Sequence, residues 1–185
     1  MEMSVMKRLL IVGFALVLCG CSIFPKGPDI QISTFDLGVP HADLNFGKCS
    51  LEAGDFQGKM PSRQKMIFRS GTNRLMADEF NRWSDVPPEM LKSFLDRAFA
   101  AKPADTGARK LLVEGDIFQF EGNLDKMTAD LEVELKVFEL PGKKPVLKKI
   151  YKESVAFEGK DASLFAAAMS SAAKKIAESL ASDIA

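Results

Sequence analysis

MTADLEVELKVFEL, residues 127–140, is the stretch of this chain that decides the fold. Apolar and charged residues alternate through its middle, so a β-strand would separate them onto two faces. One face would carry Leu131, Val133, Leu135 and Val137, and the other Asp130, Glu132, Glu134 and Lys136. This pattern predicts a long strand with one side against a hydrophobic core and the other side in water.

Two further strands are predicted beside this one, over residues 110–121 and 146–157. Leu140-Pro141-Gly142-Lys143 is typical of a hairpin connection between antiparallel neighbours, and we expect Gly122-Asn123 to turn the chain between the first pair. The three segments together predict an antiparallel meander.

The N-terminal half is predicted to form shorter elements. Strands are expected over 31–36, 43–51 and 65–70, and the last of these precedes the turn signal Gly71-Thr72-Asn73. A helix is expected to begin at Pro87-Pro88, because proline is tolerated in a first helical turn, and to end before Pro103. Its apolar face recurs at three- and four-residue spacing and comprises Leu91, Phe94, Leu95, Ala98 and Phe99.

A long helix is predicted to close the chain after an N-cap at Asp161 or Ser163. Its apolar face comprises Phe165, Ala168, Met169, Ala172, Ile176, Leu180 and Ile184. Alanines on this face permit close packing on a sheet. The order of strands, helix, three strands and helix predicts an α+β fold, a mainly antiparallel sheet with two helices packed on one face, in a single domain over 30–185.

The N-terminus has the pattern of a bacterial lipoprotein precursor. Lys7 and Arg8 precede ten apolar residues, 9–18, and then Leu18-Cys19-Gly20-Cys21. That apolar run is too short to cross a bilayer, which takes about 20 residues. We therefore predict a signal peptide over 1–20, cleavage between Gly20 and Cys21, and covalent diacylglycerol and N-acyl (palmitate) chains on Cys21. An ordinary secretory signal with incidental cysteines is the alternative.

Residues 21–29 contain Pro25, Gly27 and Pro28 without periodicity, and we expect them to tether the acyl anchor to the domain. At ~3.3 Å per residue this tether reaches about 30 Å. Ser22 follows the acylated cysteine, and in lipoproteins that this leader resembles, a residue other than Asp there implies sorting to the outer membrane. The expected location is the periplasmic face of that membrane.

Charge and cysteine content restrict the partners. Without residues 1–20, 23 basic residues face 24 acidic ones, so no excess of positive charge favours nucleic acid. Cys49 would be the one remaining free thiol, which we expect to be buried; pairing with another chain, as in a homo-oligomer, is the alternative.

The sequence offers no catalytic set. His41 is the only histidine and stands beside Pro40 in a predicted turn, so neither a zinc site nor a nucleophile and base pair can be assembled around it. The acidic row Asp130, Glu132 and Glu134 is expected to face solvent. We therefore predict no enzyme, no metal and no cofactor beyond the acyl chains.

The segment from Met66 to Pro88 holds the richest group of candidate residues. Trp83, just before a helix, is expected to fill the gap between helix and sheet, with partner recognition as the alternative. Arg69, at a strand end, can bind a carboxylate through two bonds, either inside the chain or across an interface. Arg69 and Arg82 are the candidate partner-binding residues.

The chain resembles the ABC-type transport auxiliary lipoproteins, the PqiC-like lipoproteins. The resemblance rests on the N-terminal lipoprotein motif, Phe35 to Pro40, the strand end Phe68-Arg69, Arg82-Trp83 before Pro88, and the closing Ala-rich helix. It implies an α/β fold with helices against a sheet. It also implies a non-catalytic accessory of a system in which an ABC transporter or a membrane-anchored MCE protein moves lipid between inner and outer membranes.

Two other functions stay open at this point. The chain could carry a lipid or other amphiphile in its own cavity, which a large apolar pocket would favour. It could also be an envelope assembly or scaffold lipoprotein that has no part in transport.

Overall fold

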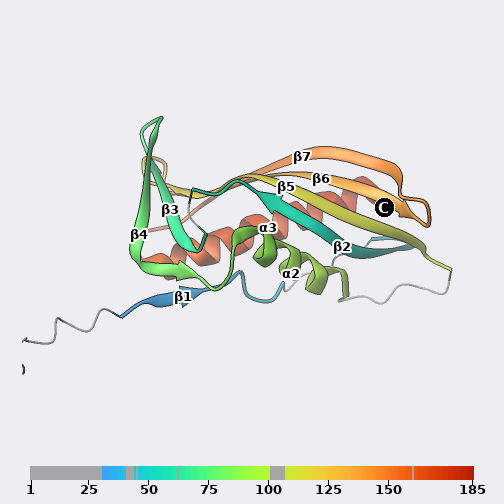
Figure 1. Cartoon of the computed structure of the whole chain (residues 1–185), viewed down its shortest axis with the longest axis horizontal. Coiled ribbons are helices and arrows are strands. Elements are labelled where there is room, and N and C mark those ends of the chain that lie inside the picture. Colours follow the sequence, from blue (N-terminus) through green and yellow to red (C-terminus); the bar gives the residue numbers. More distant parts are fainter. Residues whose placement is uncertain (1–30, 41–43, 45, 62, 101–106, 160) are drawn as a thin grey trace, which may run out of the picture. The chain divides into compact units, whose positions relative to one another are not determined.

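The predicted meander forms the centre of the computed structural model, which describes residues 31–40, 44, 46–61, 63–100, 107–159 and 161–185. Its strands are β5 (Arg109–Asn123), β6 (Thr128–Leu140) and β7 (Lys144–Ala156), all paired antiparallel in sequence order (Figure 1). The alternation within β6 has the predicted effect, since Leu131, Val133, Leu135 and Val137 are fully buried. The described elements belong to one compact unit, Ile32–Ala185.

Four shorter strands complete a seven-stranded sheet: β1 (Ser33–Phe35), β2 (Cys49–Gly58), β3 (Lys65–Ser70) and β4 (Arg74–Trp83). The prediction of β3 is confirmed. The strand predicted over 43–51 was wrong in position, because β2 begins at Cys49 and continues to Gly58. Strand β4 was not predicted; its residues 74–80 are exposed or half-buried and give no alternating pattern.

The expectation of a mainly antiparallel sheet was wrong, because the sheet is mixed. β1 pairs parallel with β4, and both β2 and β3 pair parallel with β5. The parallel pairs follow from the path of the chain between β3 and β5. β4 runs antiparallel to β3, and the helix that follows β4 packs against β2. The helix brings the chain back to the end of the sheet where β2 begins. β5 therefore starts beside the start of β2 and runs parallel to it.

Both helices cover the same face of the sheet, as expected. They are α2 (Pro87–Ala100), packed against β2, and α3 (Ala162–Ile184), packed against β6 and β7 (Figure 1). Asp161 is the N-cap of α3, and its Oδ1 accepts a hydrogen bond of 2.8 Å from the backbone N–H of Ser163. No helix among the described residues is long and apolar enough to cross a bilayer.

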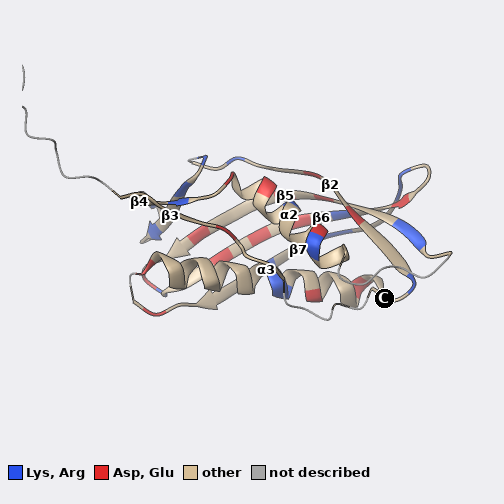
Figure 2. Ribbon diagram, turned by 90° about the horizontal axis from the view of Figure 1, so that it is seen from below, with Lys and Arg blue, Asp and Glu red and all other residues tan. Residues whose placement is uncertain are grey.

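Neither described helix covers the opposite face of the sheet, which we call the open face. Acidic and basic residues recur along the strands of the sheet, which lie behind the helices in the view of Figure 2. Lys152 contacts Glu132 at 2.7 Å, Lys148 contacts Glu134 at 3.4 Å, and Lys136 contacts Asp116. Glu132 and Glu134 are half-buried there, but Asp130 departs from the predicted solvated row because it is only 7% exposed.

Several sequence predictions lie outside the described residues. These are the signal peptide with its cleavage between Gly20 and Cys21, the acyl anchor, the tether over 21–29, and the solvated turn at His41. They stay predictions.

Candidate functional site: a polar cluster on the open face

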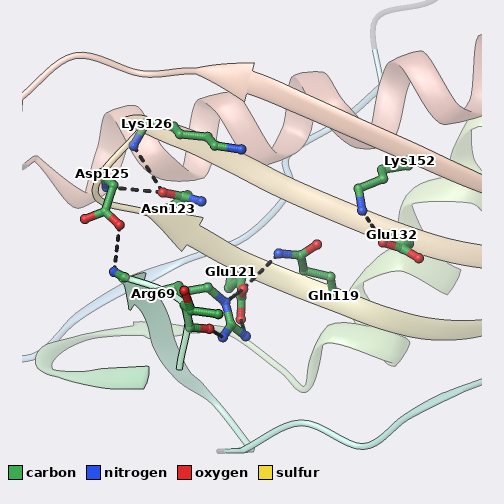
Figure 3. A network of polar contacts seen from close by, with 10 residues as sticks. Arg69, Gln119, Glu121, Asn123, Asp125, Lys126, Glu132 and Lys152 are labelled. Atoms are coloured by element: carbon green, nitrogen blue, oxygen red, sulfur yellow. Dashed lines mark hydrogen bonds and ion pairs between the residues drawn. The ribbon is translucent and has the colours of Figure 1, made fainter. Parts of the chain in front are cut away.

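Arg69 and Glu121 form the centre of the most enclosed polar group on the open face. Arg69 ends β3 in register with Asn123 of β5, which places its side chain beside that of Glu121. The guanidinium binds the carboxylate through two bonds, Nε to Oε1 at 2.5 Å and Nη2 to Oε2 at 3.1 Å (Figure 3). Glu121 is 6% exposed. Of the two roles open to Arg69, the structure shows the one inside the chain.

Further polar side chains complete this group, which we call the polar cluster: Arg69, Gln119, Glu121, Thr128 and Asp130. Gln119 donates to Oε1 of Glu121 at 2.8 Å, and Asp130 lies opposite Glu121 in the β5–β6 register. Thr128 Oγ1 and Asp130 Oδ1 are buried and have no hydrogen-bond partner among the described residues. The guanidinium binds one of the two carboxylates, and the unpartnered oxygens of Thr128 and Asp130 give the cluster spare acceptors.

A second set of contacts fixes the hairpin of β3 and β4 to the turn between β5 and β6. Asp125 in that turn accepts a hydrogen bond of 2.6 Å from the backbone N–H of Gly71 (Figure 3). Leu124 N–H donates to the carbonyl of Arg69 at 2.9 Å. Nη1 of Arg69 also donates to the carbonyl of Thr72 at 2.9 Å. The position of Arg69 is thus determined by both turns.

Electrostatics stabilise the charged form of Arg69. The hydrogen bond that Arg69 donates to Glu121 raises the pKa of Arg69 above its ordinary value. This effect outweighs the opposing effect of burial, and the charges of Glu121 and Asp130 act in the same direction. A fixed cation with a surplus of acceptors can hold a donor or a basic side chain of a partner. Among the described residues, no three His, Cys, Asp or Glu side chains are grouped to hold a metal ion.

Phe68, Trp83 and Pro88 lie on the helix-covered side of the sheet. Trp83 is 2% exposed, and its ring centroid lies 5.3 Å from that of Phe120 and 5.5 Å from that of Phe165. The expectation that this tryptophan belongs to the core is confirmed. Phe68 sits over Gly122, where an added Cβ would lie 2.5 Å from the Phe68 ring. Gly122 therefore lies within β5, where its missing side chain leaves room for the Phe68 ring. The turn predicted at Gly122-Asn123 was wrong in position, because it begins at Leu124.

Arg82 lies on the open face together with Arg69. It pairs with Lys65 of β3, and Lys65, Ile67 and Arg69 alternate onto the same side of that strand. Arg82 is half-buried, and its Nε has no hydrogen-bond partner among the described residues. Of the two candidate arginines, Arg82 has the greater unused donor capacity.

Sequence analysis missed a notch in the edge of β5. β2 pairs with β5 as far as Ile117 and β3 pairs only from Gly122, so no described strand pairs with residues 118–121 on that edge. An open pocket of about 450 Å³ lies there, lined by Gln57, Gly58, Lys59, Asp116, Ile117 and Phe118. A bulge between Ile117 and Gln119 leaves Phe118 55% exposed. The sequence does contain a signal for this bulge. The apolar residues of β5 occupy every second position up to Ile117, and the next core residue, Phe120, is one position out of that alternation.

A second pocket, of about 230 Å³, lies between the segment after β1 and the start of α2. Its lining is mostly polar, with Asp36, Ser84, Asp85, Glu89, Ser93 and Arg97. Cys49 is half-buried rather than buried, with its Sγ 4.0 Å from the carbonyl of Ile184. Neither of these features adds a reactive group to the polar cluster.

The model of one protein family, the ABC-type transport auxiliary lipoprotein component, matches residues 60–181. The chain belongs to this family. The match runs from the end of β2 to the C-terminal part of α3 and therefore contains the whole polar cluster. The resemblance noted from the sequence is confirmed, and a lipoprotein component of a transport system is the coarse function that follows.

Solved structures show the same fold. A crystal structure of a Xanthomonas campestris protein of the family DUF330 has a TM-score of 0.67 and 16% identity, covering 81% of this chain and 92% of the other. A crystal structure of an uncharacterised protein has a TM-score of 0.64 and 11% identity, covering 84% and 99%. A comparison with curated proteins found no match.

Proposed function

We propose that this protein is an outer-membrane-anchored periplasmic lipoprotein, a non-catalytic accessory of an ABC- or MCE-type intermembrane lipid transport system. Its role is to dock the partner that spans the periplasm. The observation that carries the proposal is the family match over 60–181, which makes the chain a transport auxiliary component. The polar cluster supports a docking role, because it offers recognition groups without a nucleophile and base pair.

The open face supplies the docking surface. It joins the polar cluster, Arg82 and the notch at Phe118, so charged donors, spare acceptors and one exposed ring share a single side of the sheet. Arginine and aromatic side chains are enriched at protein interfaces. Arg69 positions the other groups of the cluster and does not itself bind the partner, because its guanidinium is already bound to Glu121 and Thr72.

Anchoring makes a modest docking affinity sufficient. Acyl chains on Cys21 would hold the domain near one membrane, and confinement raises its effective concentration toward a partner that arrives from the other membrane. Cys21→Ala should leave the protein unacylated and unable to complement a deletion, as measured by mass spectrometry and by outer-membrane barrier function.

Cys19→Ala is the matched control and should change neither acylation nor complementation. Normal acylation of the Cys21→Ala variant would contradict the assignment of the lipid site. Full barrier function from the unacylated protein at ordinary expression would contradict the role of tethering. Stoichiometric phospholipid bound by the purified protein would favour a lipid carrier instead.

Arg82→Ala should weaken binding of the periplasm-spanning partner about 10-fold, the effect of losing ~1.4 kcal/mol. The measurement is co-purification of lipidated protein with its envelope partners from solubilised membranes. Arg97→Ala is the control, because Arg97 is exposed on α2, on the other side of the sheet. Equal recovery of the partner with both variants would exclude Arg82 from the docking surface.

A further inference from the structure

Two large apolar side chains are exposed together where the chain enters the domain. Ile32, directly before β1, is 48% exposed, and Phe80 of β4 is 55% exposed. β1 and β4 pair in parallel with Ser33 opposite Asn81, so Ile32 and Phe80 stand one residue before this pair on neighbouring strands. We call these two residues the entry patch.

The fold holds Phe80 outward. β3 and β4 pair at Ile67 with Ala77 and again at Lys65 with Arg82, so four residues of β4 bulge opposite one residue of β3. The carboxylate of Asp78 fixes the bulge, because it accepts hydrogen bonds from the backbone N–H groups of Phe80 and Asn81, at 2.8 and 3.0 Å. The exposure of this ring is therefore built into the backbone.

The carboxylate directly next to the ring is paired with a cation. Glu79, next to Phe80, is held by Lys65, whose Nζ lies 3.0 and 2.9 Å from the two carboxylate oxygens. An uncompensated carboxylate beside the ring would be repelled by anionic headgroups.

The short length of chain between the acylated Cys21 and the entry patch indicates that the surface that covers the patch is the bilayer. Ile32 is the eleventh residue after Cys21, so at ~3.3 Å per residue the two are at most about 36 Å apart. The start of β1 is thus the part of the domain with the shortest connection to the acyl anchor. An apolar surface there will meet the bilayer more often than any other partner.

We propose that the entry patch is a membrane-contact site. Phe80 and Ile32 insert at the boundary of headgroups and acyl chains of the bilayer that holds the anchor, and this second attachment orients the domain. The inference rests on the acyl anchor of the proposed function. Orientation by two attachments would keep the open face in a constant position for an arriving partner.

The test places an environment-sensitive nitrobenzoxadiazole probe at Phe80→Cys, in lipidated full-length protein that also carries Cys49→Ser. The protein is reconstituted into phosphatidylethanolamine and phosphatidylglycerol vesicles that contain a lipid with brominated acyl chains. Phe118→Cys is the matched control, because both rings are 55% exposed. We expect the probe at position 80 to lose most of its fluorescence to the brominated lipid and the probe at 118 to keep it.

Flotation of the vesicles distinguishes a failure of the entry patch from a failure of the proposed acyl anchor. Protein that does not float with the vesicles would contradict the acyl anchor itself. Protein that floats while neither probe is quenched, or while both are quenched equally, would overturn the entry patch and leave the anchor intact. A blue-shifted probe at position 80 that brominated lipid does not quench would show coverage by a protein or a second copy, and would also overturn it.

Discussion

Trp83→Ala is expected to lower the free energy of unfolding by about 3–5 kcal/mol, as truncations of large buried aromatics do. The indole is 2% exposed and packs edge-on against Phe120 at 5.3 Å and obliquely against Phe165 at 5.5 Å. It therefore joins the end of β4 to both β5 and α3. Removing it would leave a cavity at the point where the hairpin of β3 and β4 meets the main sheet.

Urea denaturation followed by far-ultraviolet circular dichroism measures this loss, since the only tryptophan is removed. Phe80→Ala serves as the control because its ring is mostly exposed, and its effect should stay within about 0.5 kcal/mol. A loss below about 1 kcal/mol for Trp83→Ala would show that the core at this end collapses around the gap.

The C-terminal half of the fold was predictable because its signals are local. In β6, one buried and one wet face impose a period of two, and in α3 the buried positions recur every three or four residues. The cap at Asp161 and the turn at Pro141-Gly142 follow from short-range backbone chemistry. Each of these features can be recognised without knowing what the segment packs against.

The N-terminal half was predicted poorly because its order depends on distant pairing. Residues 74–80 of β4 are exposed or half-buried, so no buried face gives the strand a pattern, and its pairing with β3 and β1 makes it a strand. The parallel direction of β2 results from the crossover through β4 and α2, which no short window of sequence contains. A mixed sheet is the consequence of that path.

The candidate site shows the same division. Arg69 was selected because a guanidinium at a strand end can bind a carboxylate inside the chain or across an interface. Its partner Glu121 is 52 residues away and is placed beside it by the sheet register. Asp130 was expected in solvent because it alternates with apolar neighbours. It is buried because it faces Glu121 at the same end of the sheet, where Arg69 also lies.

Arg69→Ala should destabilise the protein by about 2–3 kcal/mol, less than the ~3–5 kcal/mol for one partner of a fully buried pair, because the arginine side chain is 29% exposed. The variant would leave the buried carboxylates of Glu121 and Asp130 adjacent and would remove the cation bound to Glu121. Urea denaturation measures the change. Lys152→Ala is the control, because its pair with Glu132 is exposed and should contribute under about 1 kcal/mol.

Replacing both Arg69 and Glu121 distinguishes the free-energy cost of an unpaired buried charge from the stability that the salt bridge itself contributes. Arg69→Met combined with Glu121→Leu fills similar space with apolar groups, and such replacements of buried pairs are often close to neutral. Most of the stability lost in Arg69→Ala should therefore return in the double variant. If the double variant is also fully folded but binds the periplasm-spanning partner weakly, the cluster contributes recognition as well as stability. If Arg69→Ala costs no more than Lys152→Ala, water reaches the cluster freely, and its acceptors are as available to solvent as to a partner.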